Sequence, residues 1–507
     1  MLEGATARPT SDGVSSEPVS TIVLAAGEGT RMRSATPKVL HRLAGRTLIE
    51  HAVRAAAGIA PDELAVVVGH GRQAVGEHLA DLAGRLDRTI STVVQEQQLG
   101  TGDAVACGMA QLAHSGTGAS GTVLVTYGDV PLLDADTLRG LLAEHHGSGN
   151  AVTLLSAVVE DPAGYGRVVR DADGGIAGIV EHKDATTEQA AIQEINSGVY
   201  AFDAAFLEDA LKRLSTGNAQ GELYLTDLVS IARQDGLGAG TLVCTDTWLV
   251  EGVNDRVQLA RMGAELNRRL LLHWMRQGVT ITDPNSVWLD CDVELDRDVT
   301  LEPGVQLRAG TTVGTCATIG PETTLTACTV GHGATVMRTQ GEEAEIGPGA
   351  SVGPFAFLRS GARLDVDAKV GTFVEAKNAE IGSGSKVPHL SYVGDATIGE
   401  HTNIGAATVF VNYDGVAKHH TVIGSYSRTG ADNMFVAPVE VADGAYTAAG
   451  SVITQNVPPG AMAVARGKQR NIEGWVARRR PGTAADQAAQ RALAEEEAIT
   501  DPTSDAS

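Results

Sequence analysis

The predicted fold rests first on the stretch Leu24-Ala25-Ala26-Gly27-Glu28-Gly29-Thr30-Arg31-Met32, with Pro37-Lys38 close behind it. It follows an apolar run, 21–24, that is typical of a buried strand. The two glycines let the backbone approach a ligand closely, and Arg31 and Lys38 add fixed positive charge. Backbone N–H groups beside cations suit a triphosphate. The stretch therefore predicts a nucleotide-binding loop in an α/β domain, whereas Gly-x-Gly alone would indicate only a strand–loop–helix turn.

Residues 21–254 alternate apolar, strand-like runs with helical stretches. The runs are 21–24, 65–68, 122–126, 152–157 and 197–202. This alternation predicts a Rossmann-like, mainly parallel sheet with helices on both faces. Such sheets present ligand groups at the carboxyl ends of their strands, where Tyr127-Gly128-Asp129 stands. We expect Asp129 to face a ligand, although an aspartate in this position is more often a turn residue or a helix cap.

A linking helix is predicted over 255–277, where apolar residues recur at spacings of three and four. At 1.5 Å per residue an unbroken helix here would be roughly 34 Å long. It could be a strut between two domains or the last packing helix of the first domain, and the sequence leaves both possibilities open. The apolar positions are Leu259, Met262, Leu266, Leu270 and Trp274.

Small aliphatic residues recur every six positions between 281 and 465. A period of six is typical of a hexapeptide parallel β-helix with three short strands in each coil. The period breaks at 337–345 and 409–420, and we expect loops to leave the coils there. The repeating positions are Val293, Val299 and Val305, then Val313, Ile319 and Leu325, then Ile381, Val387 and Val393, with Ile398 and Ile404 restarting the phase.

Composition bounds the class of protein. A chain of 507 residues allows two or three domains, and its formal net charge of −23 disfavours nucleic acid and anionic membranes as partners. Its five cysteines lack CxxC spacing, which is typical of free thiols in a reducing compartment. Neither a signal peptide nor a membrane span is recognisable, so we expect a cytoplasmic protein.

The sequence predicts five segments. Residues 1–20 are small and polar and are expected to be disordered. An α/β domain over 21–254, the helical linker over 255–277 and a β-helical domain over 278–478 follow. The rest, 479–507, is rich in Ala, Asp and Glu and is expected to form a flexible acidic tail, with a short helix possible over 487–498.

Further polar strings suit a nucleotide-sugar pocket. The string 95–102 offers amide and hydroxyl groups for a uracil edge. Glu28 looks unhelpful beside a triphosphate, so we expect it to point to solvent.

The coils also carry polar residues that a solenoid does not need for folding. They are Arg359, the string 375–378, the string 388–392, Asn403 and the string 412–415. A lone histidine in a coil is usually a surface residue, but His389 lies inside such a string. Histidine is well suited to take a proton near neutral pH.

Together these motifs resemble sugar-1-phosphate nucleotidyltransferases. Over about 20–478 the chain resembles the bifunctional bacterial enzymes in which N-acetylglucosamine-1-phosphate uridyltransferase is fused to glucosamine-1-phosphate N-acetyltransferase. The resemblance implies a left-handed β-helix, homotrimers with the acetyl site between subunits, and synthesis of UDP-N-acetylglucosamine for peptidoglycan and lipid A. It implies Mg²⁺ as cofactor, and UTP, acetyl-CoA, glucosamine-1-phosphate and N-acetylglucosamine-1-phosphate as substrates.

For uridyl transfer, the resemblance implies catalytic roles for Lys38 and Arg31, which would neutralise the UTP phosphates, and Mg²⁺ held by Asp129 and Asn254. The implied nucleotide-side residues are Leu24, Ala25, Ala26, Gly27, Gln95, Gly100, Thr101, Tyr127, Gly128 and Asp129. The implied sugar-side residues are Gly166, Glu181, Asn196 and Asn254.

For acetyl transfer, the resemblance implies His389 as general base, acting on the amine of glucosamine-1-phosphate. Ala431 stands where the family usually has serine, so a hydroxyl contact to acetyl-CoA would be lost. Trp475 could close over the cofactor or act as a structural anchor. The implied sugar-phosphate residues are Arg359, Lys377, Tyr392 and Asn403, and the implied acetyl-CoA residues are Ala406, Asn412, Tyr413, Ala431, Ala449 and Arg466.

Two alternatives remain. The chain could be a monofunctional sugar-1-phosphate nucleotidyltransferase whose β-helix regulates or oligomerises, or a non-catalytic interaction protein. His389 with Arg359, Lys377 and Tyr392 disfavours the first alternative. The intact Lys38, Asp129, Asn254 and His389 disfavour the second.

Overall fold

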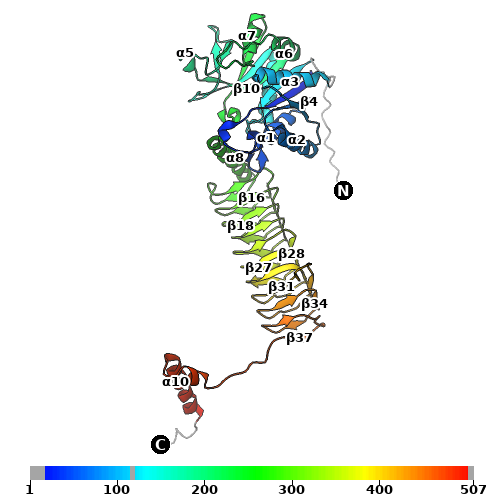
Figure 1. Ribbon diagram of the computed structural model, residues 1–507, viewed down its shortest axis with the longest axis vertical. Helices are drawn as coiled ribbons and strands as arrows, with labels where there is room; N and C mark the ends of the chain where they lie inside the picture. The colour runs from blue at the N-terminus through cyan, green and yellow to red at the C-terminus, as the bar shows by residue number, and fades with distance from the viewer. Residues whose placement is uncertain (1–16, 115–119, 501–507) are drawn as a thin grey trace. The chain divides into compact units, whose positions relative to one another are not determined.

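The computed structural model describes residues 17–114 and 120–500 (Figure 1). They fall into two compact units, with the division between Lys377 and Asn378. Most of the predicted N-terminal extension, 1–16, and the end of the predicted tail, 501–507, lie outside the described residues.

The first unit begins with a mixed sheet in the order β11-β7-β10-β6-β1-β4-β5. Neighbouring pairs are parallel except that β10 runs antiparallel to β6 and β7. The mainly parallel sheet is thus confirmed, with one antiparallel strand whose direction an apolar run cannot reveal. The strands are β1 (Val19–Ala25), β4 (Glu63–Val68), β5 (Ser91–Val94), β6 (Thr122–Tyr127), β7 (Val152–Val158), β10 (Glu194–Asp203) and β11 (Ala239–Cys244), with β8 (Arg167–Arg170) and β9 (Ile176–Val180) at the side.

Alternate residues of β1 pack into cores on opposite faces of this sheet. Ile22 and Leu24 lie in a core with α3 (Thr101–His114), α6 (Ala204–Leu211) and α7 (Asp227–Gln234). Val23 and Ala25 lie in a core with α1 (Leu48–Ala57) and α2 (Arg72–Leu86). Since β1 is buried on both faces, its sequence reads as a continuous apolar run. The remaining helices before the linker are α4 (Ala135–Ser148) and α5 (Thr187–Ala190).

Helix α8 (Arg256–Arg276) confirms the predicted linking helix. The Asp255 carboxylate caps it, accepting the backbone N–H groups of Val257 and Gln258 at 2.9 and 2.8 Å. Met262 packs into the core of the sheet domain. Asn267 is buried and bridges to the first coil, donating to Val287 O at 2.8 Å and accepting from Leu289 N at 3.0 Å. Helix α8 is therefore both the last packing helix of the sheet domain and a link to the coils.

In the first unit, the coils stack as parallel strands with a repeat of 18 residues. Trp288 pairs with Gln306, and Glu294 pairs with Thr312, a separation of 18 in each case. The repeat of six predicted from the aliphatic positions is confirmed, since every one of them is buried. The strands are β12 (Thr280–Ile281), β13 (Trp288–Leu289), β14 (Glu294–Leu295), β15 (Thr300–Leu301), β16 (Gln306–Arg308), β17 (Thr312–Val313), β18 (Thr318–Gly320), β19 (Thr324–Thr326), β20 (Thr329–Val330), β21 (Thr335–Met337), β22 (Gln340–Glu342), β23 (Glu345–Ile346), β24 (Ser351–Val352), β25 (Phe357–Leu358), β26 (Ala362–Leu364) and β27 (Lys369–Thr372).

The loop predicted at 337–345 does not form. The chain there makes a shortened coil, in which β22 pairs with β19 and β25. Gly341 takes the place of an inward aliphatic residue, and a Cβ on it would lie 2.7 Å from Leu325 Cδ2. The period therefore breaks because the coil is tighter, not because a loop leaves it.

Strand β28 (Glu375–Ile381) spans the division, and the second unit continues with parallel strands. The predicted loop at 409–420 is confirmed as the segment after β31, with Tyr413 and Lys418 bridged across it. The elements are β29 (Lys386–His389), β30 (Tyr392–Ile398), β31 (Val409–Val411), β32 (Thr421–Ile423), β33 (Met434–Val436), β34 (Val439–Val441), β35 (Tyr446–Thr447), β36 (Val452–Ile453), β37 (Met462–Ala463), α9 (Trp475–Arg479) and α10 (Ala484–Thr500).

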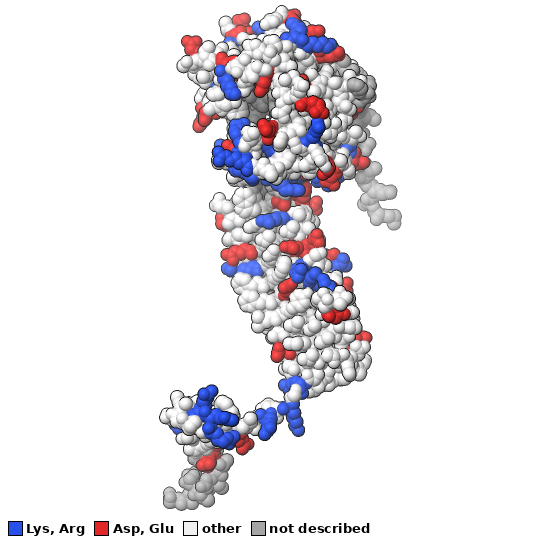
Figure 2. All heavy atoms as spheres, viewed as in Figure 1, with Lys and Arg blue, Asp and Glu red and all other residues white. Residues whose placement is uncertain are grey.

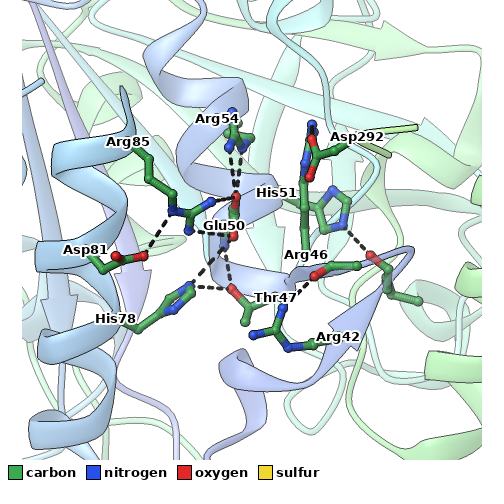
Figure 3. A network of polar contacts seen from close by, with 12 residues as sticks. Arg42, Arg46, Thr47, Glu50, His51, Arg54, His78, Asp81, Arg85 and Asp292 are labelled. Atoms are coloured by element: carbon green, nitrogen blue, oxygen red, sulfur yellow. Dashed lines mark hydrogen bonds and ion pairs between the residues drawn. The ribbon is translucent and has the colours of Figure 1, made fainter. Parts of the chain in front are cut away.

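A buried carboxylate ties α1 to α2 (Figure 3). Glu50 accepts hydrogen bonds from Arg54 Nε at 3.0 Å and from Arg85 Nη1 at 2.8 Å. Burial alone would raise the pKa of the Glu50 carboxyl, but hydrogen bonds from Arg85 and Arg54 outweigh burial and lower this pKa to about 2. Nearby, Arg46 pairs with Asp292, a residue of the first coils. These contacts join α1 to α2 and the sheet domain to the first coils.

Candidate active sites

The 27–41 loop carries both predicted phosphate-binding cations on 3₁₀ turns. Arg31 lies in η1 (Thr30–Met32), and Lys38 begins η2 (Lys38–Leu40). Gly29 has φ of 66°, and a Cβ on it would lie 2.5 Å from Lys38 Cβ, so a glycine is required where the two segments meet. Glu28 is exposed, as predicted.

The two predicted metal ligands converge on these cations. The Lys38 ammonium pairs with Asp129 Oδ2 and lies 3.4 Å from Asn254 Oδ1. Arg31 Nη2 donates to the same Asn254 oxygen at 2.8 Å. Asp129 follows β6, Asn254 precedes α8, and Val253 N donates to Asp129 O at 2.8 Å, which holds the two segments together.

A cavity of about 280 Å³ opens beside this cluster and is lined by predicted nucleotide-side residues. Burial raises the pKa of the Tyr127 phenol, so its hydroxyl stays protonated in this wall. Of the predicted nucleotide-side residues only Gly128 does not line it. The predicted lining residues are Leu24, Ala25, Ala26, Gly27, Lys38, Gln95, Gly100, Thr101, Tyr127 and Asp129.

A second cavity of about 260 Å³ adjoins the first and is lined by all four predicted sugar-side residues, Gly166, Glu181, Asn196 and Asn254. Both cavities share Thr101, Tyr127, Asp129 and Glu222 as walls. Burial is the main cause that raises the pKa of the Glu181 carboxyl, while Thr226 Oγ1 donates to it at 3.2 Å. The two cavities therefore meet at Asp129, where the cations also gather.

Sequence reasoning missed several wall residues. Glu222 lines both cavities, and Gln220 and Tyr224 line the second, all from the segment before α7. Tyr165, the neighbour of the predicted Gly166, also lines the second cavity. Gln98 belongs to the predicted string 95–102 and does line the first cavity, where its Nε2 donates to Ala26 O at 2.8 Å. The polar cluster 218–222 between two helices was the only sequence signal for this wall.

In the second unit, several predicted acetyl-CoA residues form one column. Ala407 N donates to His389 O at 3.2 Å, Asp432 N to Ala406 O at 2.7 Å, and Gly450 N to Ala431 O at 2.9 Å. Along this column, successive coils contribute His389, Ala406, Ala431 and Ala449. His389, Ala431 and Ala449 are exposed in the single chain.

Tyr392 and Asn412 also come together in the second unit. Asn412 Nδ2 donates to Asp395 Oδ2 at 2.5 Å and lies 3.4 Å from the Tyr392 hydroxyl. Tyr413 is exposed on the loop, and its hydroxyl donates to Gly415 O at 2.7 Å.

The remaining predicted acetyl-site residues lie apart from this column. Asn403 is paired in the coil ladder with Lys386 and Arg428. Arg466 and Trp475 are exposed beyond the last strand of the coils.

Arg359 and Lys377 belong to the first unit. Arg359 Nη1 pairs with Glu375 Oε1 at 2.8 Å, and its backbone N–H donates to Ala376 O at 2.8 Å. The register of Leu358 with Ala376 makes Arg359 and Lys377 neighbours on adjacent coils. Two cations side by side suit a phosphate.

None of the helices in 17–114 and 120–500 is long and apolar enough to cross a membrane. Within the same ranges no group of three or more His, Cys, Asp or Glu could hold a metal.

Comparisons with known proteins agree with this geometry. Residues 21–178 match the model of the MobA-like NTP transferase domain. The bifunctional protein GlmU of Mycobacterium sp. (strain KMS) is 57% identical over 96% of this chain and 97% of its own length. GlmU of Nocardia farcinica is 58% identical over 94% and 96%, and GlmU of Streptomyces avermitilis is 56% identical over 93% and 97%. Similarity at this level over nearly the whole length of each chain shows that this chain belongs to the family of the bifunctional protein GlmU.

Proposed function

We propose that the chain makes UDP-N-acetylglucosamine in two steps at two separate sites. Acetyl-CoA first acetylates glucosamine-1-phosphate, and the product then takes uridylyl from UTP, releasing pyrophosphate. The proposed uridyl-transfer site is supported by one observation: two cavities meet at Asp129, beside the cations Lys38 and Arg31. Membership of the GlmU family supports the pairing of this activity with acetyl transfer.

At the uridyl site, the chain mainly positions reactants and neutralises charge. UTP lies in the cavity lined by Gly27, Gln95 and Thr101, and the sugar phosphate lies in the cavity lined by Glu181 and Asn196. The phosphate oxygen of the sugar attacks the α-phosphorus in line, and pyrophosphate leaves toward Lys38 and Arg31. These two side chains stabilise the negative charge that builds on the leaving group.

Asp129 and Asn254 would hold Mg²⁺. Their oxygens already share one cation, the Lys38 ammonium, so they lie close enough together to serve a common positive charge. A carboxylate and an amide oxygen are hard ligands, and magnesium takes few protein ligands when phosphates supply others. The ion would supply further neutralisation of the triphosphate. Lys38 would then be released from Asp129 to face the phosphates.

At the acetyl site, His389 takes a proton from the substrate ammonium. The freed amine attacks the thioester carbonyl, the C–S bond breaks, and coenzyme A leaves as the thiol. The column below His389 is lined by the small residues Ala406, Ala431 and Ala449, which leave room for an extended chain such as pantetheine. Arg359 and Lys377 bind the sugar phosphate, and Tyr392 and Asn403 bind the sugar.

The remaining acetyl-CoA contacts come from Asn412, Tyr413 and Arg466, with Arg466 near the phosphates of the cofactor. At Ala431 only the backbone can contact the cofactor, a loss of about 1 kcal/mol against a hydroxyl. Trp475 closes over the cofactor or anchors the chain.

We propose that uridyl transfer belongs to 21–254 and acetyl transfer to 278–478, with α8 between them. The chain works as a trimer. Phe355 and Phe373 are 52% and 59% exposed and stack on each other with ring centroids 5.5 Å apart, which is typical of a surface that another subunit covers. Figure 2 shows broad uncharged areas on the visible face of the coils. We also propose that the enzyme works in the cytoplasm, and its five free cysteines support a reducing compartment.

A single incubation tests this function. The purified chain with glucosamine-1-phosphate, acetyl-CoA, UTP and Mg²⁺ should release free thiol and pyrophosphate and accumulate UDP-N-acetylglucosamine. Omission of acetyl-CoA should stop product formation unless N-acetylglucosamine-1-phosphate is supplied. Pyrophosphate without thiol release would instead indicate a monofunctional nucleotidyltransferase whose β-helix only regulates or oligomerises.

A further inference from the structure

The side-chain amide of Gln95 is held in one orientation in the wall of the nucleotide cavity. Gln95 is 5% exposed, directly after β5, and lines the cavity of about 280 Å³. Its Nε2 donates to Asp103 Oδ2 at 2.7 Å and to Gly100 O at 3.1 Å. Asp103 comes from the first turn of α3, so helix and strand end are joined through this amide.

The two acceptors determine which amide atom faces the cavity. A flipped amide would place Oε1 against a carboxylate and a carbonyl, neither of which can donate. The Nε2 hydrogens are both used, whereas no donor to Oε1 is found among the described residues. Gln95 therefore presents a hydrogen-bond acceptor to whatever base occupies this wall.

We propose that Asp103 is a specificity-determining positioning residue, which makes the site select uracil over cytosine. Uracil carries a donor at N3–H, which pairs with an acceptor, whereas cytosine carries a lone pair at N3. An acceptor fixed opposite that lone pair would leave two buried acceptors facing each other, which is costly. Asp103 does not touch the nucleotide and acts through Gln95. This inference rests on the proposed binding of UTP in this cavity.

Asp103 could instead only stabilise α3, because a carboxylate in the first turn interacts favourably with the N-terminal end of an α-helix. The two roles predict different results. Loss of a helix-stabilising charge would weaken binding of UTP and CTP alike, whereas loss of the orienting acceptor would change their ratio.

The test measures kcat/KM for uridyl or cytidyl transfer to N-acetylglucosamine-1-phosphate with UTP, CTP and dUTP. In Asp103→Ala and Asp103→Ser, Nε2 loses its charged acceptor and keeps Gly100 O, so the amide of Gln95 is less firmly oriented. The UTP/CTP ratio should then fall by at least about tenfold, the factor that about 1.4 kcal/mol gives. Asp103→Asn can still accept from Nε2 and should retain most of the ratio. The UTP/dUTP ratio should stay unchanged in every variant, because both nucleotides carry the same base.

Asp136→Ala is the matched control, since Asp136 is also an acid in the first turn of a helix, α4, away from both cavities. It should leave the UTP/CTP ratio unchanged. Measurable uridyl transfer with UTP shows that the sheet domain of each variant is folded, and Asp103→Ser replaces Asp103→Ala if the latter unfolds.

Two failures can be told apart. If the unmodified chain does not prefer UTP to CTP, the proposed nucleotide site itself is wrong. If it does prefer UTP and both Asp103→Ala and Asp103→Ser keep the ratio, the orienting role of Asp103 is overturned while the function stands.

Discussion

Lys38 stands at the point where the phosphate-binding loop meets the proposed metal ligands. Its approach depends on Gly29, where a Cβ would lie 2.5 Å from Lys38 Cβ. Its ammonium is shared between Asp129 and Asn254, although the three residues are far apart in the sequence. These contacts keep the ammonium beside the proposed Mg²⁺ ligands, where it would face the phosphates once the metal takes its place.

Replacement of Lys38 should therefore affect chemistry more than folding. We expect Lys38→Ala to lower kcat for uridyl transfer by about 10²–10³-fold, as for other charge-stabilising groups. Steady-state pyrophosphate release at saturating UTP measures this loss. Lys212→Ala, which removes an exposed lysine at the end of α6, should leave kcat unchanged. A Lys38→Ala variant with full kcat would remove Lys38 from the catalytic group.

Some of the predicted site residues lie beside glycines in strings that follow a strand. Asp129 and Gln95 were found in this way because the ends of neighbouring strands meet in one place. Glu222 and Tyr224 were not predicted, because they come from a loop before α7 that only tertiary packing brings to the cavity. Asp103 was not predicted, because it lines neither cavity and contacts the wall only through its hydrogen bond with Gln95.

Helices and coils were predicted from their period, and the exceptions have local causes. The apolar stripe of α8 located the helix, yet the polar Glu265 and Asn267 are among its buried residues. Asn267 is buried because it satisfies two backbone groups of the first coil. The shortened coil at Gly341 was predicted to be a loop, because both a loop and a tighter coil interrupt the six-residue repeat of aliphatic residues.

The Glu50 network makes a prediction for the packing of α1 on α2 (Figure 3). The pKa of Glu50 is about 2 in the folded chain against an ordinary value of 4.5. A carboxyl whose pKa is lower in the folded chain than in the unfolded chain stabilises the fold at any pH above its unfolded pKa, here 4.5. This stabilisation is lost as the pH falls from 4.5 toward the folded pKa of about 2. The shift corresponds to about 3 kcal/mol.

Glu50→Gln should therefore destabilise the sheet domain by about 3 kcal/mol at pH 7, with the difference shrinking between pH 4.5 and pH 2. Urea unfolding curves of the variant and of the unmodified chain, recorded at a series of pH values, give the difference in the free energy of unfolding of the sheet domain. Glu77→Gln, on the exposed face of α2, is the control and should change little. A difference that stays constant across this pH range would contradict the charge-based account.

Across the whole chain, the sequence predicted two different architectures, and both are found: a mixed α/β sheet and parallel coils. Each carries its own set of polar residues, with Asp129 in the first and His389 in the second. The central claim is that these sets act independently in one GlmU-family chain. The coils would then be catalytic as well as structural.

The most direct measurement assays both activities in two single variants, following thiol release and pyrophosphate release separately. We predict that His389→Ala abolishes acetyl transfer and keeps uridyl transfer near that of the unmodified chain. Asp129→Ala should do the reverse. If either folded variant loses both activities, or if His389→Ala keeps its thiol release, the account of two independent sites is contradicted.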